Sequence, residues 1–284
     1  MKVRIGVILG IDGGTEPEPF SEAVAAMEDL GFDSLWLAER LSTAIPDVVA
    51  GLAFAAARTT RLKLGTGVVV LPGRNPAVVA KQLATLDRLS GGRLLVAFGS
   101  GVPDPTERAL RPIPPGGRGQ VFDEALVAVR AYLEPGSAVR PAPVQQPLDL
   151  WVGGNAAAAL SRAGRLADGW LPSLISPDEA RRGRKMVEAE AEKAGRRIDP
   201  EHFGVTFFYA DNGLPDALAA AIARRRPGID PAILVPSGLS GAVDFIGECL
   251  EAGFSKFVVR PAVTPVSWSA ALEAMAEALL PLQT

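Results

Sequence analysis

Short apolar runs alternate with longer amphipathic stretches along the whole chain. The runs are rich in Val, Leu, Ile and Phe and are bounded by glycine, proline or charged residues. Continuous apolar runs of this length are typical of strands in a parallel sheet, because such a sheet is buried on both faces. They predict eight strands, over Val3–Leu9, Ser34–Ala38, Leu62–Val70, Leu94–Phe98, Leu148–Val152, Gly169–Leu171, Phe203–Tyr209 and Lys256–Val259.

The longer stretches carry apolar residues every three or four positions, which is the period of an amphipathic helix. They predict helices over Phe20–Leu30, Asp47–Arg58, Asn75–Ser90, Arg118–Leu133, Ala156–Leu166, Pro177–Ala194, Pro215–Arg225, Gly241–Ala252 and Trp268–Leu280. Asp47 is a candidate N-cap, Pro76 suits a first helical turn, and Gly31 ends the first helix. The Pro- and Gly-rich segment from Gly99 to Gly117 is expected to be a loop.

Strand–helix alternation requires parallel pairing of the strands, and eight such units predict a closed (β/α)8 TIM barrel. No segment has the composition of a domain linker, so residues 1–284 are expected to form one domain. The alternative is an open, doubly wound α/β sheet. A dinucleotide-binding sheet of that kind carries G-x-G-x-x-G at its first strand–helix turn, whereas Gly10–Gly14 has a different spacing. We therefore favour the barrel.

The composition of the chain limits the kinds of binding and catalysis that it can carry out. The chain is 48% hydrophobic and 21% charged, as in globular proteins, and its net charge of −3 provides no basic field for a nucleic-acid backbone. A single cysteine, Cys249, excludes an intramolecular disulfide and any multi-cysteine metal site. A single histidine, His202, leaves little room for metal or Ser/His/Asp chemistry. What remains is binding, or catalysis through an organic cofactor without a metal.

No targeting or membrane segment is expected. The apolar run near Met1 is too short for a signal peptide and is followed by no cleavage site, and Val48–Ala57, the longest apolar stretch, is shorter than a membrane span. We therefore expect a cytoplasmic protein that acts on a small molecule and contacts neither nucleic acid nor membrane.

Polar residues and glycines follow several predicted strands at the end where a barrel of this kind carries its site. Glu39 and Arg40 follow the second strand and are either site residues or a surface ion pair. Gly65 and Gly67 interrupt the third strand and indicate a bulge or the close approach of a ligand. Ser100, between two glycines, follows the fourth strand.

The fifth strand ends in the most informative turn. Gly153, Gly154 and Asn155 lead directly into a helix that begins with alanines. Backbone N–H groups at such a helix N-terminus can bind a phosphate, although a Gly-Gly-Asn sequence by itself is more often a plain turn. The position of this turn among other glycine-bearing strand ends favours the phosphate site.

The remaining polar candidates are weaker. Arg260 follows the eighth strand and either holds an anionic group or caps a neighbouring helix. The run Arg224–Arg226 ends a helix, where positive charge suits the macrodipole, and we assign it no further role. His202 precedes the seventh strand, at the opposite end of the barrel, and Cys249 falls in a helix as a core residue.

In four stretches the chain resembles the bacterial luciferase-like oxidoreductases, and specifically the branch that uses the deazaflavin coenzyme F420. These stretches are Leu30–Leu37, Leu64–Pro72, Ala80–Leu94, and Trp151–Asn155 with Ala167–Trp170, in the family's order. The segment Gly253–Pro261 is similar to an actinobacterial-type subgroup of the family.

The resemblance implies a luciferase-like barrel that holds a tricyclic ring at its strand ends. It places a non-proline cis peptide behind the ring at Gly67–Val68, with Val70 nearby. It places Ser100 beside the ring and Gly153, Gly154 and Asn155 at the cofactor phosphate. The family also commonly forms dimers, so a homodimer is expected.

The activity implied is hydride transfer between C5 of F420 and a small organic substrate. Glu39 is our candidate for proton handling or a hydrogen bond to the ring, with Arg40 or Asp104 in reserve, and Arg40 and Arg260 are candidate substrate contacts. One alternative is an FMN-dependent monooxygenase that takes reduced flavin from a partner reductase. Another is a non-catalytic flavin-binding barrel.

Two departures from the family pattern limit the resemblance. Many members have Asp-His or a similar pair where this chain has Glu39-Arg40, and the glutamate of the family's sugar-phosphate dehydrogenases is replaced here by Val102. We do not expect that particular activity. The segment between Leu133 and Leu148 is also shorter than in many relatives, which predicts a more open pocket.

Overall fold

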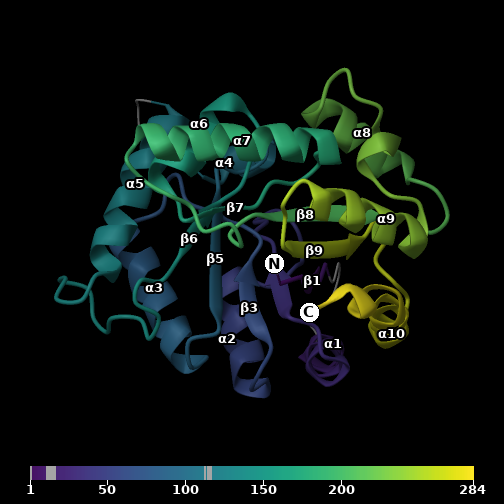
Figure 1. The fold of residues 1–284 in the computed structure, drawn as a ribbon. Helices are drawn as coiled ribbons and strands as arrows, with labels where there is room; N and C mark the ends of the chain where they lie inside the picture. Colours follow the sequence, from purple (N-terminus) through teal and green to yellow (C-terminus); the bar gives the residue numbers. More distant parts are fainter. Residues whose placement is uncertain (1, 11–16, 112, 114–116) are drawn as a thin grey trace.

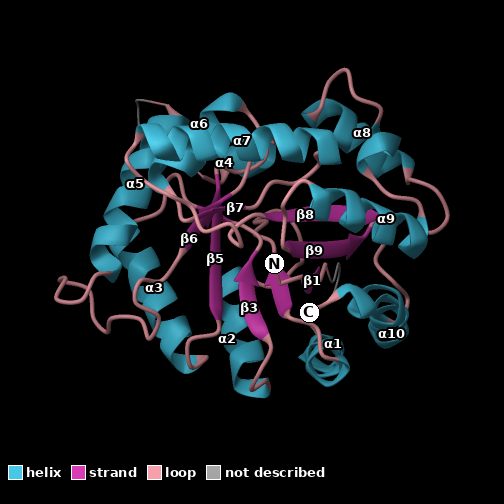
Figure 2. Ribbon diagram, viewed as in Figure 1, coloured by secondary structure: helices cyan, strands magenta, loops and turns pink. Residues whose placement is uncertain are grey.

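The computed structural model describes residues 2–10, 17–111, 113 and 117–284. In this part of the chain, parallel strands form an inner layer and helices surround them (Figures 1 and 2). The two ends of the chain meet beside the barrel, where the Val3 N–H donates to Thr284 Oγ1 at 2.9 Å. Most of the turn Gly10–Gly14, which we used against an open sheet, lies outside the described residues.

The described strands form a single sheet in the order β7-β6-β5-β3-β2-β1-β9-β8, with β4 paired to β5. They are β1 (Arg4–Ile8), β2 (Ser34–Leu37), β3 (Lys63–Thr66), β4 (Val69–Val70), β5 (Leu94–Gly99), β6 (Leu150–Val152), β7 (Gly169–Trp170), β8 (Gly204–Tyr209) and β9 (Lys256–Pro261). Parallel bridges from Trp170 to Phe203 and from Ser173 to Thr206 join the β7 and β8 edges. The predicted barrel is confirmed.

The described helices are α1 (Pro17–Leu30), α2 (Val48–Arg58), α3 (Pro76–Leu89), α4 (Pro105–Ala109), α5 (Arg118–Leu133), α6 (Ala157–Leu166), α7 (Pro177–Lys193), α8 (Asp216–Arg225), α9 (Gly238–Glu251) and α10 (Trp268–Leu279), with 3-10 turns at Pro231–Leu234 and Leu280–Leu282. Asp47 caps α2 as predicted, by accepting the Ala50 N–H at 2.9 Å. Helix α4 was missed because a single turn has too few residues to show a period. No helix of the described segments has the length and apolar character needed to cross a membrane.

A bulge divides the predicted strand Leu62–Val70 into β3 and β4, which is one of the two features that its glycines indicated. Gly65 lies opposite Leu95 of β5, and Val69 lies opposite Phe98. Four steps along one strand therefore match three along its neighbour, which is the one-residue excess of a β-bulge. Thr66 closes the gap: its Oγ1 donates to the Ala97 carbonyl and accepts the Ala97 N–H, both at 2.8 Å.

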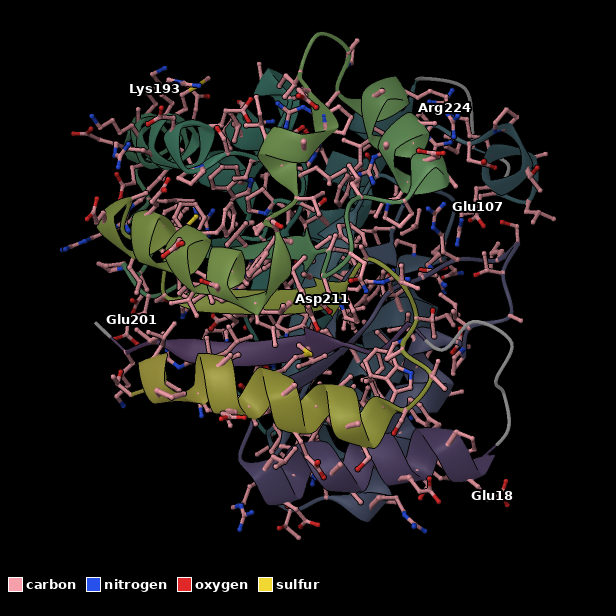
Figure 3. The ribbon with its side chains drawn as sticks, turned by 90° about the vertical axis from the view of Figure 1, so that its right-hand side faces the viewer. Glu18, Glu107, Lys193, Glu201, Asp211 and Arg224 are labelled. Atoms are coloured by element: carbon pink, nitrogen blue, oxygen red, sulfur yellow. The ribbon has the colours of Figure 1, made fainter. Side chains whose placement is uncertain are left out.

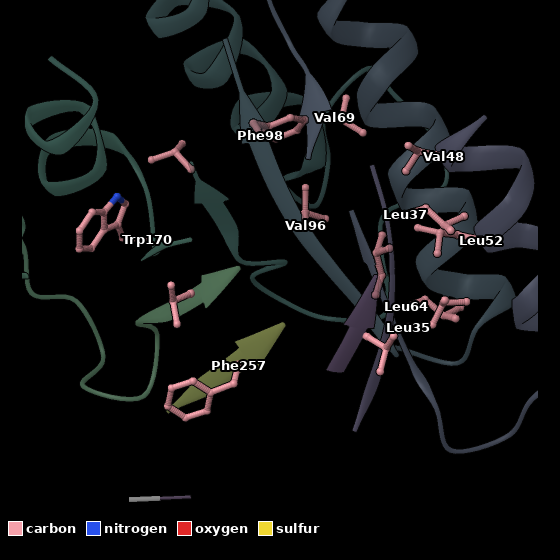
Figure 4. Packing of buried hydrophobic residues seen from close by; sticks show 14 of the residues in the cluster. Leu35, Leu37, Val48, Leu52, Leu64, Val69, Val96, Phe98, Trp170 and Phe257 are labelled. Atoms are coloured by element: carbon pink, nitrogen blue, oxygen red, sulfur yellow. The ribbon is translucent and has the colours of Figure 1, made fainter. Parts of the chain in front are cut away.

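Two apolar layers hold the barrel together. The outer layer lies between the sheet and the helices, where Leu35, Leu37 and Leu64 face Val48 and Leu52 of α2 (Figure 4). The inner layer fills the barrel below its mouth and consists of Ile8, Trp36, Ala97, Trp151, Leu171 and Val258. The two tryptophans are the largest members of this inner layer.

Glycines on the strands make room for these two indoles. A Cβ on Gly65 would lie 2.1 Å from Trp36 Cδ2, and a Cβ on Gly169 would lie 2.4 Å from Trp151 Cδ2. Gly65 therefore serves the packing of Trp36 and also precedes the bulge that the glycines of this strand indicated. Trp36 also satisfies its own polar atom, since Nε1 donates to Ser34 Oγ at 2.8 Å.

We expect Gly65→Ala to lower the free energy of unfolding by about 2–3 kcal/mol, because the new methyl group overlaps the Trp36 indole. Urea unfolding followed by tryptophan fluorescence measures the change. Gly247→Ala is the matched control: a Cβ there meets nothing within 4 Å, and the position lies inside α9. It should raise stability by about 0.5–1 kcal/mol. Equal effects of the two substitutions would contradict this account of the inner layer.

Candidate functional site

A cavity of about 350 Å³ opens at the carboxyl ends of the strands. All of the residues predicted as site residues line it, namely Glu39, Arg40, Gly67, Val68, Val70, Ser100, Gly153, Gly154, Asn155 and Arg260. In Figure 3, Glu107 and Arg224 mark the side of the molecule that carries this mouth, and Glu201 marks the other end of the barrel. The structure therefore brings the predicted residues to one place.

The bulge supplies one wall of the cavity. The peptide bond between Gly67 and Val68 is cis, as the resemblance implied, and both residues are half-buried. The Val68 side chain occupies the space that a Cβ would need at Gly99, where such an atom would lie 2.5 Å from Val68 Cγ2. A Cβ on Gly153 would be in ordinary contact with Val68 Cγ1 at 3.5 Å and closer to the Leu171 carbonyl oxygen, at 3.1 Å. Gly99 therefore lets an apolar side chain form the wall.

Glu39 holds the end of the bulge in place. Its Oε2 accepts the Val70 N–H at 2.7 Å, and its Oε1 accepts from Arg74 at 2.6 Å and from Arg111 at 2.8 Å. Arg74 also donates through Nε to the Val70 carbonyl at 3.1 Å. The suggested surface ion pair between Glu39 and Arg40 was wrong, since the Glu39 side chain is only 4% exposed and its partners are these two other arginines.

Helix α4 brings a second buried carboxylate to the rim. Glu107 accepts from the Ser42 N–H at 2.8 Å and from Ser42 Oγ at 2.6 Å, and it pairs with Arg111. Although burial opposes the shift, these hydrogen bonds lower the pKa of Glu107 to about 2. Arg111 thus joins α4 to Glu39 and the bulge.

Sequence reasoning missed Glu107 and Arg111 because it treated residues 99–117 as loop. A capping signal was present, since Asp104 precedes Pro105 and stands three residues before Glu107. In the structure Asp104 Oδ1 accepts the Glu107 N–H at 3.0 Å. Asp104, our reserve proton donor, is therefore the N-cap of α4 and is not among the described residues that line the cavity.

The Gly153–Asn155 turn presents an uncapped helix to the cavity. None of the described side chains caps α6, and its N-cap position is Ala156. Gly154 has φ +98°, and a Cβ there would lie 3.0 Å from the Ala159 Cβ, so the turn favours glycine. Trp170 Nε1 fixes the turn by donating to the Gly154 carbonyl at 2.8 Å. The first N–H groups of α6 are oriented for an anion, and the residues present fit a phosphate.

Several arginines also line the mouth of the cavity. Arg40 follows β2 and lines the cavity. Arg260 also lines it, and its guanidinium lies 5.5 Å from the Phe208 ring centroid. Arg225 and Arg226 reach the cavity from the end of α8. Our assignment of the run Arg224–Arg226 to the helix end alone was wrong for the last two. Arg226 pairs with Glu179 and also donates to the Leu174 carbonyl.

The other two chemical candidates lie away from this cavity. His202 is at the opposite end of the barrel, where its Nδ1 lies 3.0 Å from the Asp168 carbonyl oxygen and its ring packs 5.3 Å from that of Trp151. Cys249 is buried in α9, and this burial raises the pKa of its thiol to about 12. Both placements agree with the predictions.

Comparison with known proteins adds to this geometry. The sequence profile of the family described as "Luciferase-like monooxygenase" matches residues 4–274. A Mycobacterium tuberculosis protein assigned to the coenzyme F420-dependent oxidoreductases is 28% identical over 272 residues, which cover 84% of this chain and 74% of that protein.

Solved structures show the same fold. The coenzyme F420-dependent tetrahydromethanopterin reductase of Methanopyrus kandleri matches the whole of both chains with a TM-score of 0.76 at 21% identity. The oxygenating constituent of 3,6-diketocamphane monooxygenase from Pseudomonas putida, in complex with FMN, matches 99% of both chains with a TM-score of 0.71 at 18% identity.

We expect Glu107→Gln to lower the free energy of unfolding by about 2 kcal/mol at pH 7, because the charged carboxylate accepts three hydrogen bonds. The folded-state pKa lies near 2, below the ordinary value of 4.5. The stabilisation is therefore complete above about pH 4.5 and declines as pH falls toward 2.

Urea unfolding of wild type and variant between pH 7 and pH 3 measures this difference. Asp178→Asn serves as control, since it removes an exposed pair with Arg181 and should change stability by less than about 1 kcal/mol. A gap between Glu107→Gln and wild type that stays constant down to pH 3 would contradict the assignment.

Proposed function

The chain belongs to the luciferase-like monooxygenase family, and from that premise we propose that it is a coenzyme F420-dependent oxidoreductase acting on a small organic molecule. The observation that carries the proposal is one cavity that joins an apolar wall at Gly67–Val68 to an uncapped helix N-terminus beside Gly153–Asn155. This combination suits a flat ring with a phosphate-bearing side chain. When bound, the deazaflavin would supply hydride transfer to or from C5.

We assign the ring to the wall that β3, β4 and β5 form together. Val68 contributes its side chain to this wall. Gly99 and Gly101 have no side chains, so a ring can approach the backbone at the end of β5 closely. Ser100 lies between these glycines, and its carbonyl is held by Arg118 Nη1 at 2.7 Å. The loop at Ser100 can therefore keep the same backbone conformation when a ring binds against it.

We assign the phosphate to the Gly153–Asn155 turn and the first turn of α6. The glycines allow a phosphate to approach the backbone closely, and the positive end of the helix dipole favours its charge. Asn155 donates weakly to the Ser173 carbonyl at 3.5 Å, which links this turn to the segment after β7. The protein thus contributes position and electrostatics.

The inner layer keeps water out from below. Trp36, Trp151, Leu171 and Ile8 fill the barrel under the cavity, so among the described residues they close its floor. A dry floor strengthens the electrostatic contacts at the rim, because the effective dielectric constant is lower there than in water.

For Glu39 we propose a positioning role, with proton handling as the alternative. Three donors already converge on its carboxylate, from Val70, Arg74 and Arg111. Through them Glu39 orders the residues beside the bulge and the arginine that holds α4. The homodimer and the cytoplasmic location stay predictions.

An FMN-dependent monooxygenase is the second candidate, because a structural neighbour of the same fold carries FMN. The apolar wall and the phosphate turn would serve either ring. The two rings differ at position 5, where a flavin has nitrogen and reacts readily with oxygen, whereas a deazaflavin has carbon and reacts poorly.

A binding titration with F420 and with FMN, read by fluorescence quenching, tests the proposal. We expect F420 to bind at micromolar concentration and FMN at least tenfold more weakly. The reverse preference would move the protein to the monooxygenases, and binding of neither would overturn the proposed function.

Gly154→Ala should lower the affinity for the preferred cofactor at least tenfold, because the turn must distort. Gly213→Ala is the control, since it has a similar φ of +85° and lies outside the cavity.

Glu39→Gln separates the two roles of this residue. We expect lower cofactor affinity and a loss of about 3 kcal/mol of stability, because two buried or half-buried guanidiniums lose a charged partner. The shape of the pH profile of turnover should not change. Loss of one limb of that profile, with affinity and stability near wild type, would instead assign proton transfer to Glu39.

A further inference from the structure

The arginines at the mouth of the cavity divide into two groups. The charge of Arg111 is neutralised within the protein, because Arg111 pairs with Glu39 and Glu107. Arg226 is likewise neutralised by Glu179. Within the described residues, no carboxylate pairs with Arg40 or Arg225, although both side chains line the same cavity. Two cationic groups therefore face the cavity without a counter-charge from the described part of the protein.

The charges around the cavity are strongly unequal. Five of the described lining residues are arginines, and the carboxylates among them are Glu39 and Glu107, which already hold Arg74 and Arg111. The pKa of Arg225 is lowered, first because surrounding protein limits its hydration and then because Arg40 and Arg226 repel its charge. An anion between these side chains would relieve that repulsion.

The strands and helix that carry these arginines differ from those that carry the proposed cofactor site, although the two sets adjoin each other at β2 and β3 and at Ser173 and Leu174. The wall and the phosphate turn belong to β3, β4, β5 and β6, which are neighbours in the sheet. Arg40 follows β2, Arg260 is on β9, and Arg225 ends α8, the helix that follows β8. The arginines thus occupy the β8-β9-β1-β2 half of the mouth, where Phe208 and Thr206 of β8 also face the cavity.

We propose that Arg40 and Arg225 bind one carboxylate or phosphate group of the substrate, so that the protein acts on a small organic anion. Guanidinium groups suit such ligands, because their planar donors match the oxygens of a carboxylate or phosphate. Arg260, stacked on Phe208, borders the same space. This inference rests on the proposed function, since it treats the other half of the mouth as the cofactor's. An anionic group of the cofactor is the other source of the same chemistry.

Benzoate and its neutral counterpart benzamide are suitable probes, because they have the same shape and differ in charge. Calorimetric titration of the full chain, without cofactor and again with saturating cofactor, should show benzoate binding at least tenfold tighter than benzamide. Arg40→Gln and Arg225→Gln should each weaken benzoate binding at least fivefold and leave benzamide binding unchanged. Arg40→Lys, which keeps the charge, should recover most of the affinity. The buffer must contain no phosphate or sulfate.

Arg224→Gln is the matched control, since Arg224 adjoins Arg225 on α8 and is exposed as Arg225 is, but does not line the cavity (Figure 3). It should change benzoate affinity by less than twofold. An equal effect of Arg224→Gln would show only a general field, and equal binding of benzoate and benzamide would show no anion site. Either result overturns the proposal.

A third result would reassign the site. If the Arg40 and Arg225 variants weaken the cofactor itself, and saturating cofactor abolishes benzoate binding, the anion belongs to the cofactor and the substrate assignment fails. Failure of the proposed function is a separate outcome, because it appears as binding of neither F420 nor FMN. The benzoate titration of the cofactor-free protein would still report on the arginines in that case.

Discussion

The extra residue in the strand that runs through β3 and β4 is the constraint on which the cavity depends. Thr66 ties one side of the bulge to Ala97, and Glu39 ties the other side through the Val70 N–H. Between these two fixed points Gly67 and Val68 keep backbone hydrogen bonds to Leu37 and Glu39, and both residues line the cavity. Gly99 at the end of β5 then leaves room for the Val68 side chain. A single register shift therefore shapes the wall and requires a glycine beside it.

Buried charge extends this constraint to the rim. Glu39 and Glu107 share Arg111, so the segment after β2, the end of β4 and helix α4 form one connected network. Removing either carboxylate would leave the buried Arg111 guanidinium with one charged partner instead of two, which is destabilising because the group is poorly solvated. Among the described lining residues, this network contains both carboxylates, and neither of them pairs with Arg40 or Arg225. The described lining is therefore cationic near these two arginines, and the positive end of α6 also borders the cavity.

Long elements, in which the hydrophobic pattern repeats several times, were predictable from the sequence. Short elements, and features that depend on side-chain contacts, were not. The boundaries of α5 at Arg118 and Leu133 were predicted without error, and the Asp47 cap was confirmed. Helix α4 is a single turn, and its cap was hidden in a segment rich in proline and glycine. Arg225 and Arg226 were understood only as a helix end, because nothing local shows what a helix faces. The bulge after Gly65 was indicated by the sequence, but the packing of Trp36 against this glycine was not, because Trp36 is on another strand.

The sequence by itself determined the alternation of strand and helix, and with it the parallel barrel and the end at which polar residues gather. These features follow from the local period of hydrophobic positions and from where each strand stops, so neighbouring residues suffice to predict them. The tertiary structure alone decided which charges pair. Glu39 meets Arg74 and Arg111 rather than its sequence neighbour Arg40, because successive side chains beyond a strand point in different directions and partners come from other loops. Pairing depends on distances through space, and closure of the barrel sets those distances.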